Sequence, residues 1–222
     1  MEKKFHLEKE ALLASGIKRK NKLAVYGKKL AYLNEQFIHQ IWPPPHPTGK
    51  ARDLFHWLWE EKPARYKSNG DFRLSRVIDA QLDEENQTVG NCLGLTLFYN
   101  CLLRRMGIRA EALYLENAFG MGPHVLTLLQ AEASTIDIEN ILPDGFDYKG
   151  HLNNPSRTRW RDKELVADIY HSLGNEFFGK GEFAKALKNY NMAIKLNPLY
   201  EKAHLNKAIL MDKIRDEKGK VI

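Results

Sequence analysis

The chain has 222 residues, of which 43% are hydrophobic and 28% charged, and its formal net charge is +6. This length suits one moderate domain, or one domain with a small appendage. The composition excludes collagen-like, wholly disordered and disulfide-scaffold proteins. The positive charge lies at the ends, because residues 1–50 carry a net +6 and residues 165–222 a net +3, whereas residues 51–164 carry a net −3. The middle of the chain therefore offers no basic field for an anionic substrate.

Targeting and membrane signals are not apparent in the sequence. Residues 1–10 are mostly charged and are not followed by the apolar stretch of a secretory signal. The longest apolar run, residues 92–103, is shorter than the roughly 18 residues of a membrane span. On one helix, Cys92 and Cys101 would point in opposite directions about 13.5 Å apart along the axis, so they cannot pair. We therefore expect a reduced, cytoplasmic protein without membrane contact.

Motifs for metals, dinucleotides and nucleotides are missing as well. The sequence contains no CxxC, HExxH, GxGxxG or Walker-type glycine loop. Each of these patterns places ligands or backbone donors at a spacing that its ligand requires. The sequence accordingly predicts no cofactor and no metal.

The first 42 residues are expected to form a helical segment. A short apolar stripe is followed by a longer one with helical spacing; the residues are Leu12, Leu13 and Ile17, then Leu23, Tyr26, Leu30, Leu33 and Phe37. Four prolines within residues 43–47 then remove backbone donors and fix φ. Residues 43–50 are therefore expected to be a linker without regular structure.

The basic run Lys18–Lys22 raises the question of nucleic-acid binding through residues 1–50. A short charge run is usually a solvated helix face or the turn between two helices. No aromatic residues are interleaved with it to stack on bases. We interpret the run as solvated surface, and nucleic acid is not the expected partner.

Residues 51–164 are expected to form the main domain. A helical pattern resumes over Ala51–Glu61, and the acidic stretch Asp83–Asn86 lacks the spacing of a calcium loop, which indicates a solvated loop. The run from Cys92 to Met106 is apolar nearly all round, which is typical of a buried central helix. Gly90 and Asn91 suit its N-cap, and Gly107 suits its C-terminal end.

Three alternating runs after this helix predict strands. They cover residues 108–115, 124–129 and 135–139 and are separated by short breaks that contain Gly, Asn or Ser. The predicted order is therefore helix, strand, strand, strand.

This order brings together three residues with chemistry of their own. Cys92 lies in the first turn of the predicted helix, where the partial positive charge of a helix N-terminus favours a thiolate. His124 opens the second strand, and Asp137 lies on the polar face of the third with Thr135 and Glu139. If these strands are antiparallel neighbours, His124 and Asp137 would stand side by side. That is the arrangement of a Cys–His–Asp triad, although an inert buried cysteine and a structural histidine would give the same spacing.

The same residues resemble the transglutaminase-like superfamily. The features are Gly90-Asn91-Cys92-Leu93 before an apolar helix, the exit Arg105-Met-Gly-Ile-Arg-Ala110, then Pro123-His124-Val125 and Ile136-Asp137. The resemblance covers about residues 70–150 and is closest to the bacterial and archaeal branch, in which a short core is joined to repeats. It implies an α+β, papain-like fold, with the cysteine-bearing helix packed on an antiparallel sheet.

The resemblance also implies roles for the three residues. Cys92 would be the nucleophile, His124 the general base and then acid, and Asp137 the residue that orients the imidazole. The oxyanion would be held by the Cys92 backbone N–H and a second donor, for which Asn86 and Gln87 are the candidates. The implied function is thiol acyl chemistry on an amide or peptide, with hydrolysis as the default over acyl transfer.

The last part of the chain, residues 165–222, is expected to be a tetratricopeptide tail. Residues 167–200 match the pattern of about 34 residues, in which Gly174 and Ala186 let two helices approach closely. One repeat and a capping helix cannot bury a solenoid core alone, so the tail should dock on its own core or on another chain. Its concave-face positions hold His171, Asn175 and Asn206, which are peptide-binding candidates or incidental polar residues of a cap.

The sequence therefore predicts a papain-like, transglutaminase-like α+β domain with N-terminal helices and a short tail. The leading function is thiol acyl hydrolysis or transfer on a peptide or protein. A catalytically silent interaction module stays open as the alternative. Leu126 stands where many active members carry tryptophan, and Ile138 stands where proline often follows the aspartate.

Overall fold

The computed structural model of the chain describes residues 5–42, 46–131 and 134–219. It divides into two compact units. The core unit is His6–Arg161, and the tail unit begins at Asp162. The N-terminal helices thus belong to the same unit as the rest of the core. The boundary to the tail lies between residues 161 and 162, three residues before the expected boundary between residues 164 and 165.

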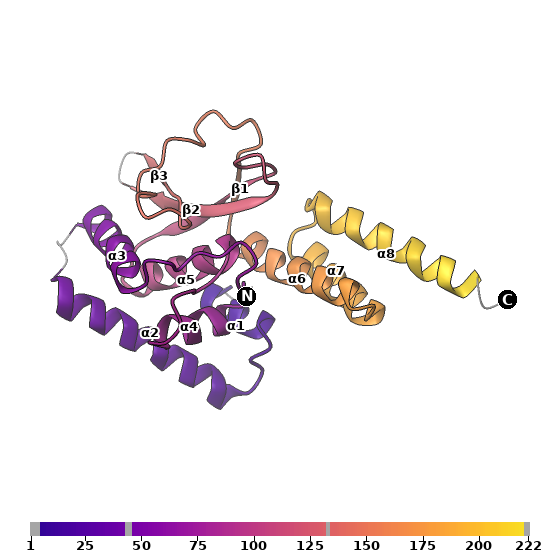
Figure 1. The fold of residues 1–222 in the computed structure, drawn as a ribbon, viewed down its shortest axis with the longest axis horizontal. Helices are drawn as coiled ribbons and strands as arrows, with labels where there is room; N and C mark the ends of the chain where they lie inside the picture. Colours follow the sequence, from indigo (N-terminus) through magenta and orange to yellow (C-terminus); the bar gives the residue numbers. More distant parts are fainter. Residues whose placement is uncertain (1–4, 43–45, 132–133, 220–222) are drawn as a thin grey trace. The chain divides into compact units, whose positions relative to one another are not determined.

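Five helices and one sheet make up the described part of the core unit, and the α+β class expected from the sequence is confirmed. The helices gather on one side of the sheet, and the long loop after β3 arches over the other side (Figure 1). The helices are α1 (Leu7–Ala14), α2 (Lys20–Ile41), α3 (Pro47–Glu61), α4 (Leu74–Leu82) and α5 (Cys92–Arg105). The strands are β1 (Ala110–Leu115), β2 (His124–Gln130), β3 (Thr135–Ile138) and β4 (Thr158–Trp160).

The four strands form one antiparallel sheet in the order β3-β2-β1-β4. The three runs expected to be strands are β1, β2 and β3. The fourth strand has only three residues, too few for an alternating pattern to be recognised in the sequence. It is held against β1 partly by Trp160, whose ring stacks on Tyr114 with a centroid distance of 4.1 Å.

Helix α5 is the central helix of the core unit. All its residues from Leu93 to Leu103 are buried, as its all-round apolar sequence predicts. It packs on β2 and β1 on one side and on α4 on the other. The cysteine-bearing helix is thus packed on an antiparallel sheet. It ends at Arg105, and Gly107, two residues further on, has a φ of +75°, which is readily adopted only by glycine.

The proline-rich segment differs in part from its expectation. Pro43–Pro45 lie outside the described residues, but Pro47 and the residues after it form the first turn of α3. His46 caps this helix by accepting a hydrogen bond from the Gly49 N–H at 2.9 Å. Proline is tolerated here because the N–H that it lacks has no partner in a first turn. Residues 46–50 are therefore the cap and the first residues of α3 and not a linker.

The N-terminal helices are fastened to the core by ion pairs as well as by apolar packing. Arg105 at the end of α5 pairs with Glu8 of α1 at 2.7 Å. Lys29 of α2 pairs with Asp79 of α4, which also accepts a hydrogen bond from Tyr26 at 2.8 Å. The basic run Lys18–Lys22 is exposed and spans the turn between α1 and α2 and the first residues of α2.

The tail unit holds the three helices α6 (Asp162–Gly179), α7 (Phe183–Leu196) and α8 (Glu201–Gly219). Helices α6 and α7 pack closely because Gly174 lies against the ring of Tyr190, which leaves no space for a side chain. Apolar side chains of both helices and of α8 surround this contact; they are Phe177, Phe178, Phe183, Ala186, Leu187, Leu210 and Ile214. Within the described ranges, no helix has the length and apolar character needed to cross a membrane.

Candidate functional site

The N-terminus of α5 carries Cys92 as its first residue. Asn91 caps the helix, because its side-chain oxygen accepts a hydrogen bond from the Gly94 N–H at 3.0 Å. Position 94 favours glycine, because a Cβ there would come within 2.5 Å of the Asp71 carbonyl oxygen. Cys92 itself is half-buried. The backbone N–H groups of Cys92 and Leu93 lie outside the intrahelical ladder, as they do in the first turn of any helix.

A ladder of buried polar side chains fixes the register of α5 on the sheet. The Thr96 hydroxyl donates to the Val125 carbonyl at 3.2 Å, and the Thr127 hydroxyl donates to the Asn100 side chain at 2.7 Å. Cys92, Thr96 and Asn100 are four residues apart, so they share one face of the helix. Since Thr96 lies beside Val125, the preceding turn of the helix brings Cys92 to His124 at the start of β2.

His124 interacts with both Cys92 and Glu139. Its Nε2 lies 2.9 Å and 2.8 Å from the two carboxylate oxygens of Glu139. Burial acts to lower the pKa of His124, but hydrogen bonds and charge attraction to Cys92 and Glu139 outweigh it and raise the pKa to about 10. Because Nε2 faces Glu139, Nδ1 is the ring nitrogen left to face the thiol. His124 therefore lies between a thiol and a carboxylate.

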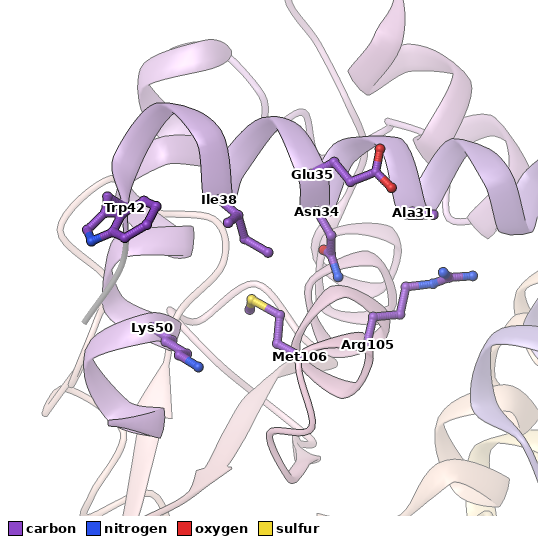
Figure 2. A pocket seen from close by; sticks show the side chains of 8 residues that line it. All are labelled: Ala31, Asn34, Glu35, Ile38, Trp42, Lys50, Arg105 and Met106. Carbon is purple, nitrogen blue, oxygen red and sulfur yellow. The ribbon is translucent and has the colours of Figure 1, made fainter. Parts of the chain in front are cut away.

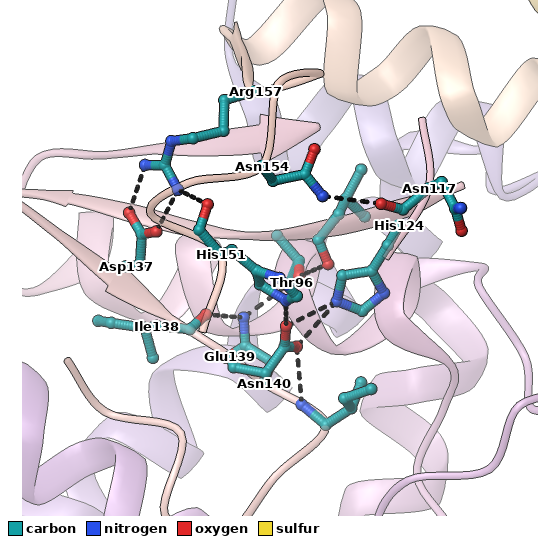
Figure 3. A network of polar contacts seen from close by, with 12 residues as sticks. Thr96, Asn117, His124, Asp137, Ile138, Glu139, Asn140, His151, Asn154 and Arg157 are labelled. Atoms are coloured by element: carbon teal, nitrogen blue, oxygen red, sulfur yellow. Dashed lines mark hydrogen bonds and ion pairs between the residues drawn. The ribbon is translucent and has the colours of Figure 1, made fainter. Parts of the chain in front are cut away.

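Glu139 is fully buried and has a second imidazole partner. The Nε2 of His151 lies 3.0 Å from Oε2 of Glu139, and this histidine is also buried. Figure 3 shows the two imidazoles converging on the carboxylate. Burial acts to raise the pKa of Glu139, but the hydrogen bonds from His124 and His151 outweigh it and hold the pKa below its usual range. Glu139 is thus ionised and bridges two histidines.

Asp137 lies elsewhere, and the register of the sheet explains why. Leu128 is paired with Asp137 across the two strands, so Asp137 is four residues, or about 13 Å, along β2 from His124. Glu139 points to the same face of β3 and lies two residues nearer to His124. The sequence placed the polar face correctly, but Glu139 stands beside the imidazole where Asp137 was expected.

The carboxylate of Asp137 instead holds Arg157. The two Asp137 oxygens accept hydrogen bonds from Arg157 at 2.6 and 3.0 Å, and Arg157 also donates to the His151 carbonyl at 3.0 Å. The hydrogen bond to Asp137 raises the pKa of Arg157. Asp137 therefore fixes the loop that carries His151, and it is linked to His124 through Arg157, His151 and Glu139 (Figure 3).

An aromatic residue covers both imidazoles. The ring of Phe119 meets His124 and His151 edge-on, with centroid distances of 5.7 and 4.8 Å. Phe119 is 43% exposed and has a φ of +54°, which is uncommon for a residue with a side chain. Its loop is closed by a hydrogen bond from the Gly122 N–H to the Asn117 side chain at 3.0 Å. The site thus has an apolar rim beside the imidazoles.

The two oxyanion candidates lie in the loop before α5. The side-chain oxygen of Asn86 accepts hydrogen bonds from the Thr88 N–H and hydroxyl, both at 3.0 Å, and its carbonyl accepts one from buried Lys62 at 2.8 Å. Gln87 is exposed. Asn86 is therefore held in its own loop, and its role as a second donor stays a prediction, as does that of Gln87.

Tyr66 is an additional neighbour of the site. Its backbone forms a parallel bridge with Gly90, two residues before Cys92. Burial raises the pKa of Tyr66, and the negative charges of Cys92 and Glu139 raise it further. The Tyr66 hydroxyl is therefore a protonated donor within the electrostatic reach of both groups.

The donor atoms of His124, Glu139 and His151 could also hold a metal ion. One ligand atom from each residue lies within 4.8 Å of the other two, and all three side chains are buried. The sequence predicted no metal because these residues, at positions 124, 139 and 151, follow no motif spacing. Only the return of β3 and its following loop to the start of β2 brings them together.

The three polar residues of the tail are brought together by α6 and α8. The Asn206 amide donates to Nε2 of His171 at 3.0 Å and to the Asn175 oxygen at 2.8 Å. The Asn175 oxygen also accepts from Tyr190 at 2.9 Å, and the Tyr200 hydroxyl lies 3.1 Å from Nδ1 of His171. These side chains satisfy one another, so their role in binding a peptide remains a prediction.

A separate cavity of about 520 Å³ lies at the other end of α5 (Figure 2). Its walls include Ile38, the exposed Trp42 and Met106, with Arg105 at one side. The Asn34 side chain points into it, and its oxygen is buried without a hydrogen-bond partner in the described part of the chain. The length of α5, about 21 Å, separates this cavity from Cys92.

Sequence reasoning missed Glu139, His151, Phe119 and Tyr66 as site residues. Glu139 was placed on the correct face of its strand, so the alternation contained a usable signal for it. His151 and Phe119 lie in loops, where no periodicity applies. Tyr66 reaches the site through a single backbone bridge, which no spacing reveals.

Comparison with known proteins identifies part of the tail. Residues 167–200 match the tetratricopeptide repeat model, which confirms the repeat predicted there and points to protein–protein interaction. A curated but uncharacterized protein of Methanocaldococcus jannaschii is 44% identical over 45 residues, which are 20% of this chain and 52% of the relative. The chain thus spans about half the length of that relative. No solved structure matches the chain.

Proposed function

We propose that the core unit carries out thiol acyl chemistry on an amide or peptide, with Cys92 as the nucleophile. The observation that carries this proposal is the position of His124, which interacts with Cys92 on one side and with the ionised, buried Glu139 on the other. A nucleophile, a base and a group that orients the base are the three parts that such chemistry needs. The resemblance of residues 70–150 to the transglutaminase-like superfamily supports the same function.

The reaction would proceed in two stages. The Cys92 thiolate attacks the carbonyl carbon and forms a C–S bond, while the carbonyl π electrons move to oxygen. When the carbonyl re-forms, the C–N bond breaks and His124 gives its proton to the leaving nitrogen. Water then attacks the thioester, His124 accepts its proton, and the C–S bond breaks to release the acid and restore the thiolate.

Other groups around Cys92 have roles that follow from their positions. Glu139 holds the imidazole through Nε2 and stabilises its charged form, which is the role that the family resemblance implied for Asp137. The backbone N–H groups at the start of α5 are donors for the oxyanion, and Tyr66 is a candidate second donor beside Asn86 and Gln87. Hydrolysis is proposed over acyl transfer, because no tunnel for a second substrate is indicated by the sequence.

Alkylation of Cys92 by iodoacetamide tests the proposal. At neutral pH, Cys92 should react much faster than the buried Cys101, and His124→Ala should slow Cys92 by at least about tenfold because the imidazolium that stabilises the thiolate is lost. Peptide mapping by mass spectrometry assigns the label to each cysteine. A Cys92 rate that does not respond to His124→Ala would contradict the proposal.

A second measurement detects acylation of Cys92. An activated ester such as p-nitrophenyl acetate should release nitrophenol in a burst, and the acetyl group should appear on Cys92 in an intact-mass spectrum. Cys92→Ser should abolish both signals, whereas Cys101→Ser should keep them. No acylation of the folded wild-type chain would favour the silent interaction module.

The tail supports a second function, interaction with another protein. In addition to its repeat, helix α8 exposes Leu205 and Ile209 (60% and 47% exposed) in the described part of the chain. Because the two residues are four apart, they adjoin on one face of the helix, and a contiguous exposed apolar patch is a candidate interaction surface. If the partner is a second copy of the chain, sedimentation should show a dimer that is lost on Leu205→Glu but kept on His204→Glu, an exposed neighbour.

A further inference from the structure

Glu139 contacts two histidines, but the proposed thiol chemistry uses only one of them, His124. His124 needs a single carboxylate to orient it, and Glu139 provides that through both oxygens. His151 then adds a second imidazole to the same buried carboxylate at 3.0 Å. Two imidazole nitrogens and one carboxylate whose ligand atoms lie this close together are a ligand set of divalent transition metals.

We propose that His124, Glu139 and His151 form a binding site for a divalent transition-metal ion of the zinc class. Their ligand atoms lie within 4.8 Å of one another. Zinc ligands about 2.0–2.2 Å from a tetrahedral ion are roughly 3.3 Å apart. The observed nitrogen–oxygen separations of 2.8–3.0 Å therefore need to widen by only a few tenths of an ångström.

The chemistry of the surroundings suits a cation. Both histidines present Nε2 to the carboxylate of Glu139, which is fully buried. Contacts behind the ligands fix His151, because Arg157 donates to its carbonyl at 3.0 Å and is itself held by Asp137. Such outer contacts orient metal ligands and support affinity.

The three ligand side chains are shielded from solvent. Glu139 is fully buried, His124 and His151 are 7% and 4% exposed, and Phe119 covers both rings. A metal ion would replace the imidazole protons that now bridge to Glu139. Since Cys92 faces the other nitrogen of His124, the thiol would not be a ligand. The inference therefore does not require Cys92, although the site shares His124 and Glu139 with the proposed thiol chemistry.

Metal titration of the untagged full chain tests the site. After treatment with a chelator and dialysis, Zn²⁺ should bind by calorimetry with one ion per chain, and Co²⁺ should give visible absorption bands from a bound, low-symmetry ion. Cys92→Ser should bind equally well and show the same cobalt bands. Loss of binding in Cys92→Ser would place sulfur among the ligands and overturn the three-residue site.

Two variants locate the ion. His151→Gln keeps a hydrogen-bond donor for Glu139 but removes the imidazole, and it should weaken affinity by more than the roughly 10–100-fold typical of outer-shell losses. His56→Gln removes an exposed imidazole on α3 and should leave affinity unchanged. Should His151→Gln fail to fold by circular dichroism, Glu139→Gln serves in its place. No binding by the wild-type chain, or equal binding by a folded ligand variant, would overturn the inference.

Discussion

Glu139 faces Nε2 of His124 with both carboxylate oxygens, at 2.9 and 2.8 Å, although it lies two residues beyond the aspartate expected there. Both residues are buried, and Glu139 is fully so. A charged pair in such a place is stabilising only while both members are present, because removal of one leaves an uncompensated charge. The first two predictions follow from this pair.

Glu139→Gln should lower the pKa of His124, whereas Asp137→Asn should not. The glutamine loses the charge that raises the pKa of His124, so this pKa should fall from about 10 in the variant. We also expect a loss of about 1–3 kcal/mol in the free energy of unfolding, the cost of an imperfectly satisfied buried group. Nitrogen NMR of the imidazoles measures the pKa, and urea unfolding measures the stability.

Asp137→Asn provides the matched control, since Asp137 binds Arg157 rather than the ring. It should leave the His124 pKa near its wild-type value and lower stability only modestly. A shift in His124 as large as that of Glu139→Gln would show that Asp137 acts on the imidazole after all.

The stability of the chain should fall at alkaline pH because of His124. Its folded pKa is raised to about 10, whereas an unfolded histidine has a pKa of about 6.5. A raised folded pKa means that the stabilisation is fully present below about pH 6.5 and is lost as the pH rises through about 10. Urea unfolding with a chelator present should show this decline.

A comparison of the wild type with His124→Gln isolates the contribution of His124. The difference between their free energies of unfolding should shrink between about pH 6.5 and 10. A difference that stays constant over that range would mean that His124 is not held in its charged form.

The cap of α5 should matter for stability and for the position of Cys92. Asn91→Ala removes the acceptor of the Gly94 N–H and should cost about 1 kcal/mol, within the usual range of roughly 0.5–2 for N-caps. Cys92 alkylation should also slow, because the first turn of the helix frays. Asn91→Ser keeps a capping oxygen and should stay close to the wild type in both measurements. Equal behaviour of the two variants would argue against the cap.

Gly174→Ala should destabilise the tail unit alone. Its methyl group would overlap the ring of Tyr190, where α6 and α7 approach most closely, and overpacking of this kind costs about 1–3 kcal/mol. Gly179→Ala is the matched control on the same helix, since nothing lies within 4 Å of its added Cβ. Hydrogen exchange read by mass spectrometry should show faster exchange in α6 and α7 for Gly174→Ala only, with α5 unaffected.

The sequence by itself determined the elements and their order. Periodicity identified α2, α5 and the strands β1, β2 and β3, because a buried face leaves its spacing in the sequence. The repeat pattern located the tail, in which Gly174 lets two helices approach closely as expected. The sequence also put Cys92 at a helix start and His124 at a strand start, which local capping and alternation suffice to decide.

Tertiary structure decided which residues meet. Whether Asp137 or Glu139 reaches His124 depends on the register of β3 against β2, and both registers present the same polar face. His151 and Phe119 come from loops, whose paths depend on contacts such as those of Arg157 with Asp137 and the His151 carbonyl. Alternation along a strand indicates which face is buried, but it does not indicate the register between two strands. The composition of the site was therefore fixed by long-range pairing, which no local pattern contains.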